Sequence, residues 1–566
     1  MTNRNGIVTR REFVMAMGAI GGAGAAYHAL TAMGLLGIPK TYAASLELPA
    51  GSLEDITIVV IGGGLAGLCA AYRAANAGAK VTVLEATERY GGRSLTVRPK
   101  GDKSPNNVPY YSEYREWDWN EPSVCNWTKK RGLYLNTGPG RIPQHHETVL
   151  HYCRKLGVKL EPYIFIDEAN LLQTDAAFGG KPVPIRQIKY NLFGYIAEML
   201  AKVENPARLN GPMDAGDIEA FRSMLTSFGN LQKSKAGDLL FKTTPRAGYS
   251  VEPGAGLNAG VELTQPSLEH ILETEFWNTG LFKDFEYFWQ TSLMQPVGGM
   301  DMIWRAFLQA PVEVGLHGKK GPLWELVHRN SPVTRIDIVV VEDGNKVQVT
   351  CGGTNACTTK SYDYCISTMA THILGNTAGN FIDAPTRSIL KSVDYIPACK
   401  VGWQAKTRFW EKEDRIYGGI SWTTDIISQI WYPSSGFHEE FGVLTGAYNR
   451  GDQARQFQAM TVAERIKAAL AGGEKLHPGF ADKVFHEKPK QGLTIAWAKM
   501  PYQVGGWAND TSETQPDLYP KLIGISPIGN KVYLAGDYFS YWPGWQVGAL
   551  DSAHLATDDI ARRVRG

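Results

Sequence analysis

Three glycines near the start of the chain have the spacing that a dinucleotide-binding turn requires. Gly62, Gly64 and Gly67 form a GxGxxG pattern, and Glu85 ends the next apolar run. In such a turn the first glycine permits the sharp bend, the second lets the backbone approach a pyrophosphate, and the third lets a helix pack closely on a strand. The acid can accept hydrogen bonds from the ribose hydroxyls of the same ligand. The pattern therefore predicts a dinucleotide site.

The residues on both sides of the glycines have the composition of the elements that must position them. Residues 56–61 are rich in β-branched side chains, as in a buried parallel strand. Residues 68–76 are rich in alanine and lack glycine and proline, so they are expected to form a helix, and residues 80–85 form the next strand. The start of such a helix presents free N–H groups to phosphates. Besides the glycines and the acid, the predicted contacts are Leu65, Ala66 and Ala86.

Two further segments resemble the flavin amine oxidase superfamily. Gly91-Gly92-Arg93-Ser94 is similar to its GG-R segment, in which the arginine supports the diphosphate region of FAD. Residues 531–537 read as a strand ending in Asp537, and residues 541–553 run into a helix whose start would approach the flavin carbonyl. They resemble the closing FAD motif, with Asp537 where the family commonly has Glu. The resemblance implies FAD contacts from Gly92, Arg93, Asp537, Gln546, Val547 and Ala549.

Matches to the L-amino acid oxidases of this superfamily occur between the two anchors. Residues 135–143 (LNTGPGRIP) resemble a G-P-x-R-x-P segment, and residues 295–301 (QPVGGMD) resemble an element near the domain junction. Val333 matches a strand whose backbone meets adenine. With these matches the resemblance covers nearly everything from residue 55 onward. It implies additional cofactor contacts from Gly138, Pro139, Gly140, Arg141 and Val333.

The resemblance also implies roles for the residues around the reacting atoms. A guanidinium offers two parallel donors to a carboxylate and does not titrate, so Arg141 is predicted to anchor a substrate carboxylate, with a further hydrogen bond from Tyr448. Trp545 is predicted to form an aromatic wall beside the flavin, and the Gly544 carbonyl to face the substrate amine. Lys400 is predicted to hold a water near flavin N5 that helps O2 to react. The alternatives are an ion-pair role for Arg141, core packing for Trp545 and a buried partner for Lys400.

These residues predict oxidative deamination of an L-amino acid. Hydride transfer from Cα to flavin N5 gives an imino acid, water converts it to a 2-oxo acid and ammonia, and O2 reoxidises the flavin to yield hydrogen peroxide. Monoamine oxidases attach FAD to a cysteine in a GG-C context, but Trp507 follows Gly505-Gly506 here, so non-covalent FAD is expected. An L-amino acid 2-monooxygenase, an amine or polyamine oxidase and a non-catalytic FAD-binding protein remain alternatives. The preferred side chain stays open, with Trp422 and Trp507 as candidate pocket walls.

The two FAD anchors lie at opposite ends of the chain, so the FAD-binding domain must be discontinuous. We expect an α/β chain with the amine oxidase fold, in which a Rossmann-like domain receives an inserted α+β substrate-binding domain with a helical segment. The Rossmann-like domain is expected to comprise residues 50–142, 290–375 and 490–566, and the inserted domain residues 143–289 and 376–489. A polar, aromatic-rich insertion at 101–131 is either a surface excursion or an entrance lid.

The N-terminal residues 1–44 resemble a twin-arginine export signal. Arg10 and Arg11 precede a Gly- and Ala-rich stretch without charge, residues 16–37. A membrane anchor is the alternative, which the glycines and His28 disfavour, and no later segment is apolar and long enough to span a bilayer. Because this route carries folded proteins, we expect a flavoprotein that is exported with its cofactor to the periplasm or beyond the cell.

Composition excludes several other function classes. The 566 residues carry a formal net charge of +2, which gives no support to nucleic-acid binding. The seven cysteines include no CxxC pair and no Cys/His cluster with zinc spacing, so no metal site is expected. Cys351 and Cys357 could pair in an oxidising compartment, but independent buried thiols are the favoured interpretation. The expected partners are an L-amino acid and O2, and a homodimer is one state that the resemblance allows.

Overall fold

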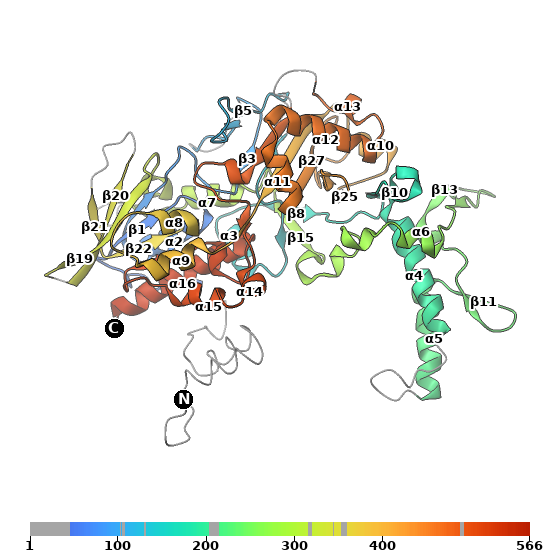
Figure 1. Ribbon diagram of the computed structural model, residues 1–566, viewed down its shortest axis with the longest axis horizontal. Coiled ribbons are helices and arrows are strands. Elements are labelled where there is room, and N and C mark those ends of the chain that lie inside the picture. Colours follow the sequence, from blue (N-terminus) through green and yellow to red (C-terminus); the bar gives the residue numbers. More distant parts are fainter. Residues whose placement is uncertain are drawn as a thin grey trace.

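The computed structural model describes most of the chain after residue 45 (Figure 1). The described residues are 46–101, 104, 108–128, 132–202, 214–314, 320–342, 344–352, 359–486 and 492–565. The predicted export signal, with Arg10 and Arg11, lies outside them and stays a prediction. Among the described residues, no helix combines the length and the apolar character that a membrane crossing would need.

A five-stranded parallel sheet holds the glycine-rich turn. Its strands, in spatial order, are β18 (Val327–His328), β2 (Lys80–Leu84), β1 (Thr57–Ile61), β22 (Tyr364–Ser367) and β30 (Val532–Leu534). The strands predicted at 56–61 and 80–85 are β1 and β2, which pair in parallel. Because strands far apart in the sequence share this sheet, the structure confirms the discontinuous α/β organisation of the fold.

Both faces of this sheet are covered, which explains why its strands are apolar throughout. Successive side chains of a strand point to opposite faces. Ile58 and Val60 of β1 therefore enter one core, beneath α2 (Leu65–Asn76), whereas Val59 and Ile61 enter a second core. The second core is shared with the helices α8 (Thr371–Asn376), α9 (Ala384–Lys391) and α15 (Tyr519–Gly524) and the antiparallel strands β19 (Val333–Val341), β20 (Gly344–Cys351) and β21 (Lys360–Tyr362).

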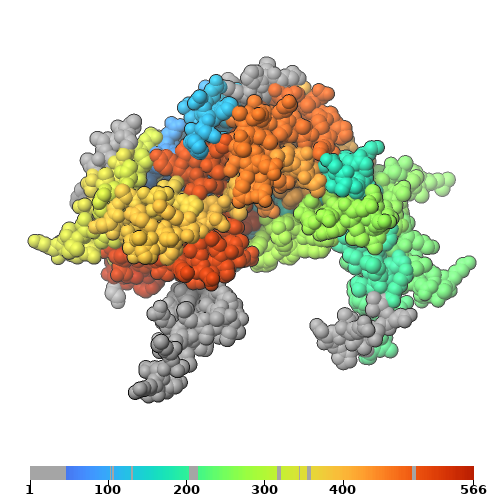
Figure 2. Space-filling model, in the orientation of Figure 1, coloured from blue at the N-terminus to red at the C-terminus, as the bar shows by residue number. Residues whose placement is uncertain are grey.

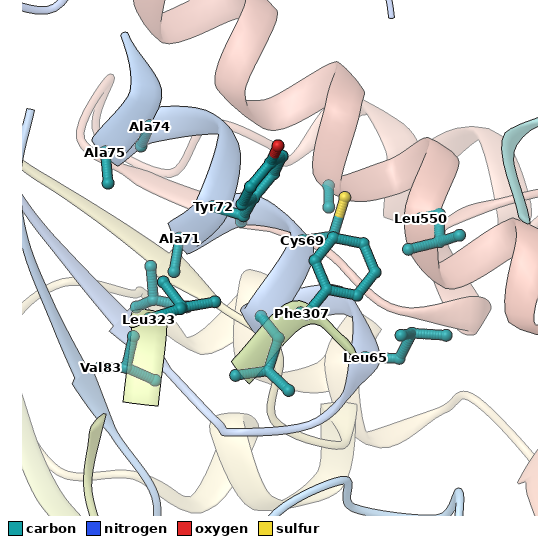
Figure 3. Close-up of a cluster of buried hydrophobic side chains, with 14 of the residues drawn as sticks. Leu65, Cys69, Ala71, Tyr72, Ala74, Ala75, Val83, Phe307, Leu323 and Leu550 are labelled. Atoms are coloured by element: carbon teal, nitrogen blue, oxygen red, sulfur yellow. The ribbon is translucent and has the colours of Figure 1, made fainter. Parts of the chain in front are cut away.

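The predicted helix α2 is the centre of the first core. All of its residues except Asn76 are buried, and its small side chains let the C-terminal helix α16 (Gln546–Arg565) lie close beside it. Figure 3 shows Cys69 and Leu65 of α2 beside Phe307, which comes from α7 (Met302–Gln309), and near Leu550 of α16. Helix α2 and the C-terminal helix α16 thus pack as one layer, together with α3 (Glu147–Lys155).

A seven-stranded sheet forms the second half of the body. In spatial order its strands are β10 (Val183–Pro184), β9 (Leu171–Gln173), β25 (Ile420–Thr423), β26 (Gln429–Trp431), β27 (Gly442–Arg450), β24 (Ala398–Ala405) and β28 (Leu493–Ala496). The helices α10 (Phe409–Glu413), α11 (Gly451–Ala459), α12 (Val462–Leu476) and α13 (Phe480–Lys483) lie above it (Figure 1). Cys399, Val401 and Trp403 of β24 pack toward these helices, which leaves Ala398 and Lys400 on the other face.

A helical arm extends away from this body. Helices α4 (Ile185–Ala201) and α5 (Ala215–Gly229) pack on each other and project at the right of Figures 1 and 2. Close packing relies on Gly229, since a Cβ there would lie 2.3 Å from the Cβ of Ala197. Asp214 and Asp217 form a capping box at the start of α5. The arm supplies the expected helical segment of the amine oxidase fold.

A buried charge cluster joins the QPVGGMD element to the strand after the GG-R segment. Gln295 and Pro296 end β15 (Leu293–Pro296), which pairs with β7 (Ile142–Pro143) and β8 (Leu160–Tyr163). Asp301 has no exposed surface, and its carboxylate accepts hydrogen bonds from Arg98 at 2.7 and 2.9 Å and from Arg305 at 2.5 Å. The element therefore has a structural role at the junction.

The described part of the 101–131 insertion packs against the seven-stranded sheet. It forms β4 (Glu113–Tyr114) and β5 (Ser123–Val124), and the Tyr114 hydroxyl donates to the Thr494 carbonyl at 2.8 Å. Glu116 is buried and accepts two hydrogen bonds from Arg465 of α12, at 2.7 and 2.9 Å. None of its described residues lines the cavity described below, which favours the excursion over the lid.

The cysteines differ from expectation at one position. Cys69, Cys125, Cys153, Cys365 and Cys399 are buried thiols outside disulfides, in agreement with the expectation. Cys351, at the end of β20, is instead disulfide-bonded. Cys357, the remaining cysteine, lies outside the described residues. The expectation of an independent thiol at Cys351 is therefore wrong, because position 351 lies at a half-exposed strand end rather than in a core.

Candidate active site

One cavity of about 370 Å³ connects the two sheets. It begins at the carboxyl ends of β1, β2, β22 and β30, where open α/β sheets bind ligands, and it extends to the face of β24–β27 that carries Lys400. Most predicted site residues line it, namely Gly62, Gly64, Leu65, Ala66, Glu85, Ala86, Gly92, Arg93, Gly138, Pro139, Gly140, Arg141, Val333, Lys400, Tyr448, Asp537, Gly544, Trp545, Gln546 and Ala549.

Two predicted contact residues lie behind the cavity wall. Val547 is buried in the core beneath α16. Gly67 touches the preceding turn, because a Cβ at this position would lie 2.0 Å from the carbonyl oxygen of Gly62. The predicted role of Gly67 in the close packing of helix on strand accounts for its position. Val547 does not line the cavity, so the lining does not support its predicted contact with the ligand.

The glycine turn forms a cradle that side chains would fill. Gly62 has φ +111°, and a Cβ there would lie 2.2 Å from the Thr368 hydroxyl oxygen. Gly64 is the N-cap of α2 and offers no capping side chain, so the N–H groups of the first turn remain available to a phosphate. Thr368 follows β22 and lines the same cavity, although sequence reasoning missed it.

Glu85 is held rigidly at the opposite side of this cradle. Its Oε2 accepts from the Gly63 N–H at 2.7 Å, and its Oε1 accepts from the N–H and the hydroxyl of Thr87 at 2.8 and 2.7 Å. A carboxylate has about four acceptor sites, so about one remains for a ribose hydroxyl. Val333 also lines the cavity.

Arg93 and Asp537 join the two predicted FAD segments by an ion pair. Arg93 Nη1 donates to Asp537 Oδ2 at 3.2 Å, and Nη2 donates to Oδ1. Asp537 Oδ2 also accepts from the Gly544 N–H at 3.2 Å. Burial lowers the pKa of Arg93, but the adjacent Asp537 carboxylate outweighs it, so the net pKa is raised. The short Asp side chain thus positions the arginine and the turn before α16.

Lys400 lies between the LNTGPGRIP segment, residues 135–143, and Tyr448. Its Nζ donates to the carbonyl oxygens of Asn136 at 2.9 Å and Gly138 at 2.6 Å, and it lies 4.6 Å from the ring centre of Trp431. Across the strands it faces Tyr448 of β27. Burial lowers the pKa of Lys400 to about 7, with a further contribution from Arg141. The amine can therefore exchange a proton near neutral pH.

Arg141 is a half-buried cation in an aromatic cage. Its guanidinium carbon lies 4.0, 4.9, 5.2 and 5.7 Å from the ring centres of Trp289, Trp431, Phe165 and Tyr163. Nε and Nη1 are buried without a hydrogen-bond partner, and no carboxylate of the described residues forms an ion pair with it. Burial lowers the pKa of Arg141, and Tyr163 and Tyr448 oppose that shift. A buried charged donor without a partner is costly, so the site fits an anionic ligand group.

Trp545 stands next to this cage. Its ring lies 5.3 Å from that of Trp289 and 5.0 Å, edge to face, from that of His146. Burial lowers the pKa of His146 to about 3, so this imidazole is a neutral packing partner of the wall. Gly544, just before it, has φ +78° and lines the cavity.

Sequence reasoning missed several residues of the cavity. Trp422 and Trp507, the candidate walls, do line it. The other aromatic and polar residues near Arg141 come from the segment after β8, from β26, from the end of β27 and from the segment before β15, where no periodicity marks a functional side chain. They are Phe165, Lys283, Trp289, Gln429, Trp431 and Arg450.

Comparisons with known proteins agree with this geometry. The family described as "Flavin containing amine oxidoreductase" matches residues 65–561. An L-amino-acid oxidase of Naja atra is 26% identical over 550 residues, covering 91% of both chains. A putative L-amino-acid oxidase of Bacillus subtilis is 24% identical over 540 residues, covering 89% of this chain and 94% of that protein.

Solved structures of similar fold include two amine oxidases. Cyclohexylamine oxidase from Brevibacterium oxydans has a TM-score of 0.55 and 15% identity, and covers 90% of this chain and 100% of its own. Putrescine oxidase bound to putrescine has a TM-score of 0.53 and 15% identity, and covers 90% of this chain and 99% of its own. At this identity the likeness concerns the fold alone.

Proposed function

Because the chain belongs to the flavin-containing amine oxidoreductase family, we propose that it oxidatively deaminates L-amino acids with O2 as electron acceptor. The products are a 2-oxo acid, ammonia and hydrogen peroxide. One observation carries the proposal beyond the family: Arg141 lines the cavity as a half-buried cation without a carboxylate partner among the described residues. A substrate carboxylate supplies the missing partner, whereas a simple amine does not.

The family implies a flavin. As FAD, it fits the part of the cavity that is lined by the glycine turn and Glu85. The cradle of Gly62 and Gly64 would hold its diphosphate, and Glu85 its ribose. Binding is proposed to be non-covalent, since Trp507 lines the cavity after Gly505-Gly506. When bound, the flavin accepts two electrons from the substrate and passes them to O2.

The chain's own residues orient the substrate around its α-carbon. Arg141 holds the α-carboxylate through its guanidinium, and Tyr448 adds a hydrogen bond from its phenol, whose pKa burial raises. Trp545 closes one side and the Gly544 carbonyl accepts from the amine. Oxidation removes a hydride from Cα and a proton from the amine, after which water adds to the imine carbon and ammonia leaves.

Lys400 has the properties of a proton donor for the oxygen reaction. O2 takes up two electrons and two protons to become hydrogen peroxide. The Lys400 Nζ, with a pKa of about 7 and two carbonyl acceptors that fix its position, can supply one of these protons and recover it from solvent.

Export of the folded flavoprotein is part of the proposal. Arg10 and Arg11 precede the uncharged Gly- and Ala-rich stretch, and Cys351 is disulfide-bonded. Disulfides persist in oxidising compartments such as the periplasm and the extracellular space. The predicted domain boundaries and a homodimer likewise stay proposals.

Peroxide release from the purified holoenzyme tests the function. Each of the twenty amino acids is supplied as both enantiomers, together with the corresponding amines, and the organic product is identified. We expect peroxide and a 2-oxo acid from L-amino acids only. Amide with CO2 would indicate a 2-monooxygenase, turnover of amines alone would indicate an amine oxidase, and an unreduced flavin under anaerobic conditions would indicate a binding protein.

A further inference from the structure

The part of the cavity around Arg141 carries basic side chains and no acid. We call it the substrate half, and its charged or titratable lining residues are Arg141, Lys283, Lys400, Tyr448 and Arg450. The two carboxylates among the described lining residues, Glu85 and Asp537, belong to the glycine turn and to the Arg93 ion pair. A substrate side chain therefore enters a region of positive charge.

Most of this charge is already accounted for. Arg141 is reserved for the α-carboxylate in the proposed function. Lys400 donates to two carbonyl oxygens and has a pKa of about 7, so it carries only part of a charge near neutral pH. Lys283 Nζ lies 2.7 Å from both carboxylate oxygens of Glu286. Among the described residues no carboxylate forms an ion pair with Arg450. Arg450 is thus the cation of the substrate half whose charge is not balanced.

The strand pleat places Arg450 beside the substrate anchor. Arg450 ends β27 two residues after Tyr448, so both side chains point to the same face, and the strand partners Lys400 and Ala398 line the cavity with them. Its charge also adds to the lowering of the pKa of Arg141, after burial. The Arg450 side chain is exposed, which places it where the cavity meets solvent.

We propose that Arg450 makes the substrate half selective for L-amino acids whose side chain ends in a carboxylate. This inference rests on the proposed function, because Arg141 must hold the α-carboxylate. Arg450 lines the same cavity as Arg141, and its charge acts on Arg141, so a side-chain carboxylate of a substrate held by Arg141 meets a second cation. A cationic side chain is repelled by the same charge.

The isosteric pair L-glutamate and L-glutamine isolates the charge. For the wild-type holoenzyme we expect kcat/KM to be at least about tenfold higher for L-glutamate, and lowest for L-lysine. Arg450→Gln should lower kcat/KM for L-glutamate at least tenfold more than for L-glutamine. Arg455→Gln is the matched control, because Arg455 lies on α11, is exposed, pairs with Asp452 and does not line the cavity. It should leave the ratio unchanged.

Binding provides a readout that does not depend on turnover. Titration of the flavin absorbance with glutarate and with its half-amide, glutaramate, in which a neutral amide replaces one of the two carboxylates, gives two Kd values for the wild type. Tighter binding of glutarate by about tenfold, lost in Arg450→Gln, supports the inference. Equal Kd values, or an equal loss of kcat/KM for both amino acids in Arg450→Gln, overturn it, since Arg450 would then only attract carboxylates in general. Absence of peroxide with every L-amino acid would overturn the proposed function instead, and the two Kd values would still decide the selectivity.

Discussion

The guanidinium carbon of Arg141 lies 4.0 Å from the centre of the Trp289 ring, and both side chains line the same cavity. Trp289 also lies 5.3 Å from Trp545 and stacks on Phe165 at 4.9 Å. A cation over an aromatic face is attracted without being neutralised, by about 2 kcal/mol when desolvated. The cage therefore fixes the direction of the guanidinium without giving its Nε and Nη1 donors a hydrogen-bond acceptor.

Loss of the guanidinium should abolish carboxylate recognition. Arg141→Gln is expected to lower kcat/KM for L-amino acids by about 10²- to 10³-fold, because removing one partner of a buried charge pair costs about 2–5 kcal/mol. Steady-state peroxide release measures the change. The control is Arg415→Gln, an exposed arginine paired with Glu252. A loss below threefold, with amines still oxidised, would contradict the anchoring role and support an amine oxidase.

Removal of the cage should weaken binding more than chemistry. Trp289→Ala frees the Arg141 side chain, so we expect KM to rise about 10- to 30-fold with a smaller change in kcat, in line with about 2 kcal/mol of lost cation–π attraction. Trp289→Phe should retain part of the affinity. Trp117→Ala, at a side chain that is 69% exposed, serves as the control. Equal effects of Trp289→Ala and Trp289→Phe would show that the ring face is unimportant.

The burial of Lys400 predicts a specific dependence of stability on pH. Its pKa is about 7 in the fold and 10.5 in an unfolded chain, so between these values the unfolded state binds more protons and rising pH favours the folded state. Below pH 7 both states hold the proton and the site contributes no slope. Relative to Lys400→Met, the wild type should gain stability from pH 7 to about 10, as measured by thermal unfolding. Lys467→Met, at an exposed residue of α12, should show no such trend, and a constant difference for Lys400→Met would refute the assignment.

A methyl group at the glycine turn should expel the cofactor. Gly67→Ala places a Cβ 2.0 Å from the Gly62 carbonyl oxygen, so α2 must move away from the turn. Overpacking of this kind costs about 1–3 kcal/mol, and the flavin-to-protein absorbance ratio should fall. Gly524→Ala is the matched control, since a Cβ at this helical glycine would meet no atom within 4 Å, and the variant should keep its flavin. Full flavin content in Gly67→Ala would rule out the close-packing role.

Local patterns in the sequence determined the dinucleotide half of the site. Glycine spacing and β-branched runs are short-range signals, because a turn, a strand and a helix start each depend on neighbouring residues. Gly62, Gly64 and Glu85 accordingly stand where the pattern places them. Val547 is the exception, because the sequence cannot show which side of the α16 start faces the cavity.

Only the tertiary structure decided the electrostatics of the substrate half. The sequence identified Arg141 and Lys400 by resemblance, but Trp289, Trp431 and Arg450 reach them from segments whose separation along the chain leaves no local signal. The lowered pKa of Lys400 and a half-buried Arg141 guanidinium without a carboxylate partner in the described part of the chain both depend on burial and on what lies within a few ångströms. The sequence thus determined which chemical groups are present and in what order, and packing between distant segments decided which of their charges remain available to a ligand.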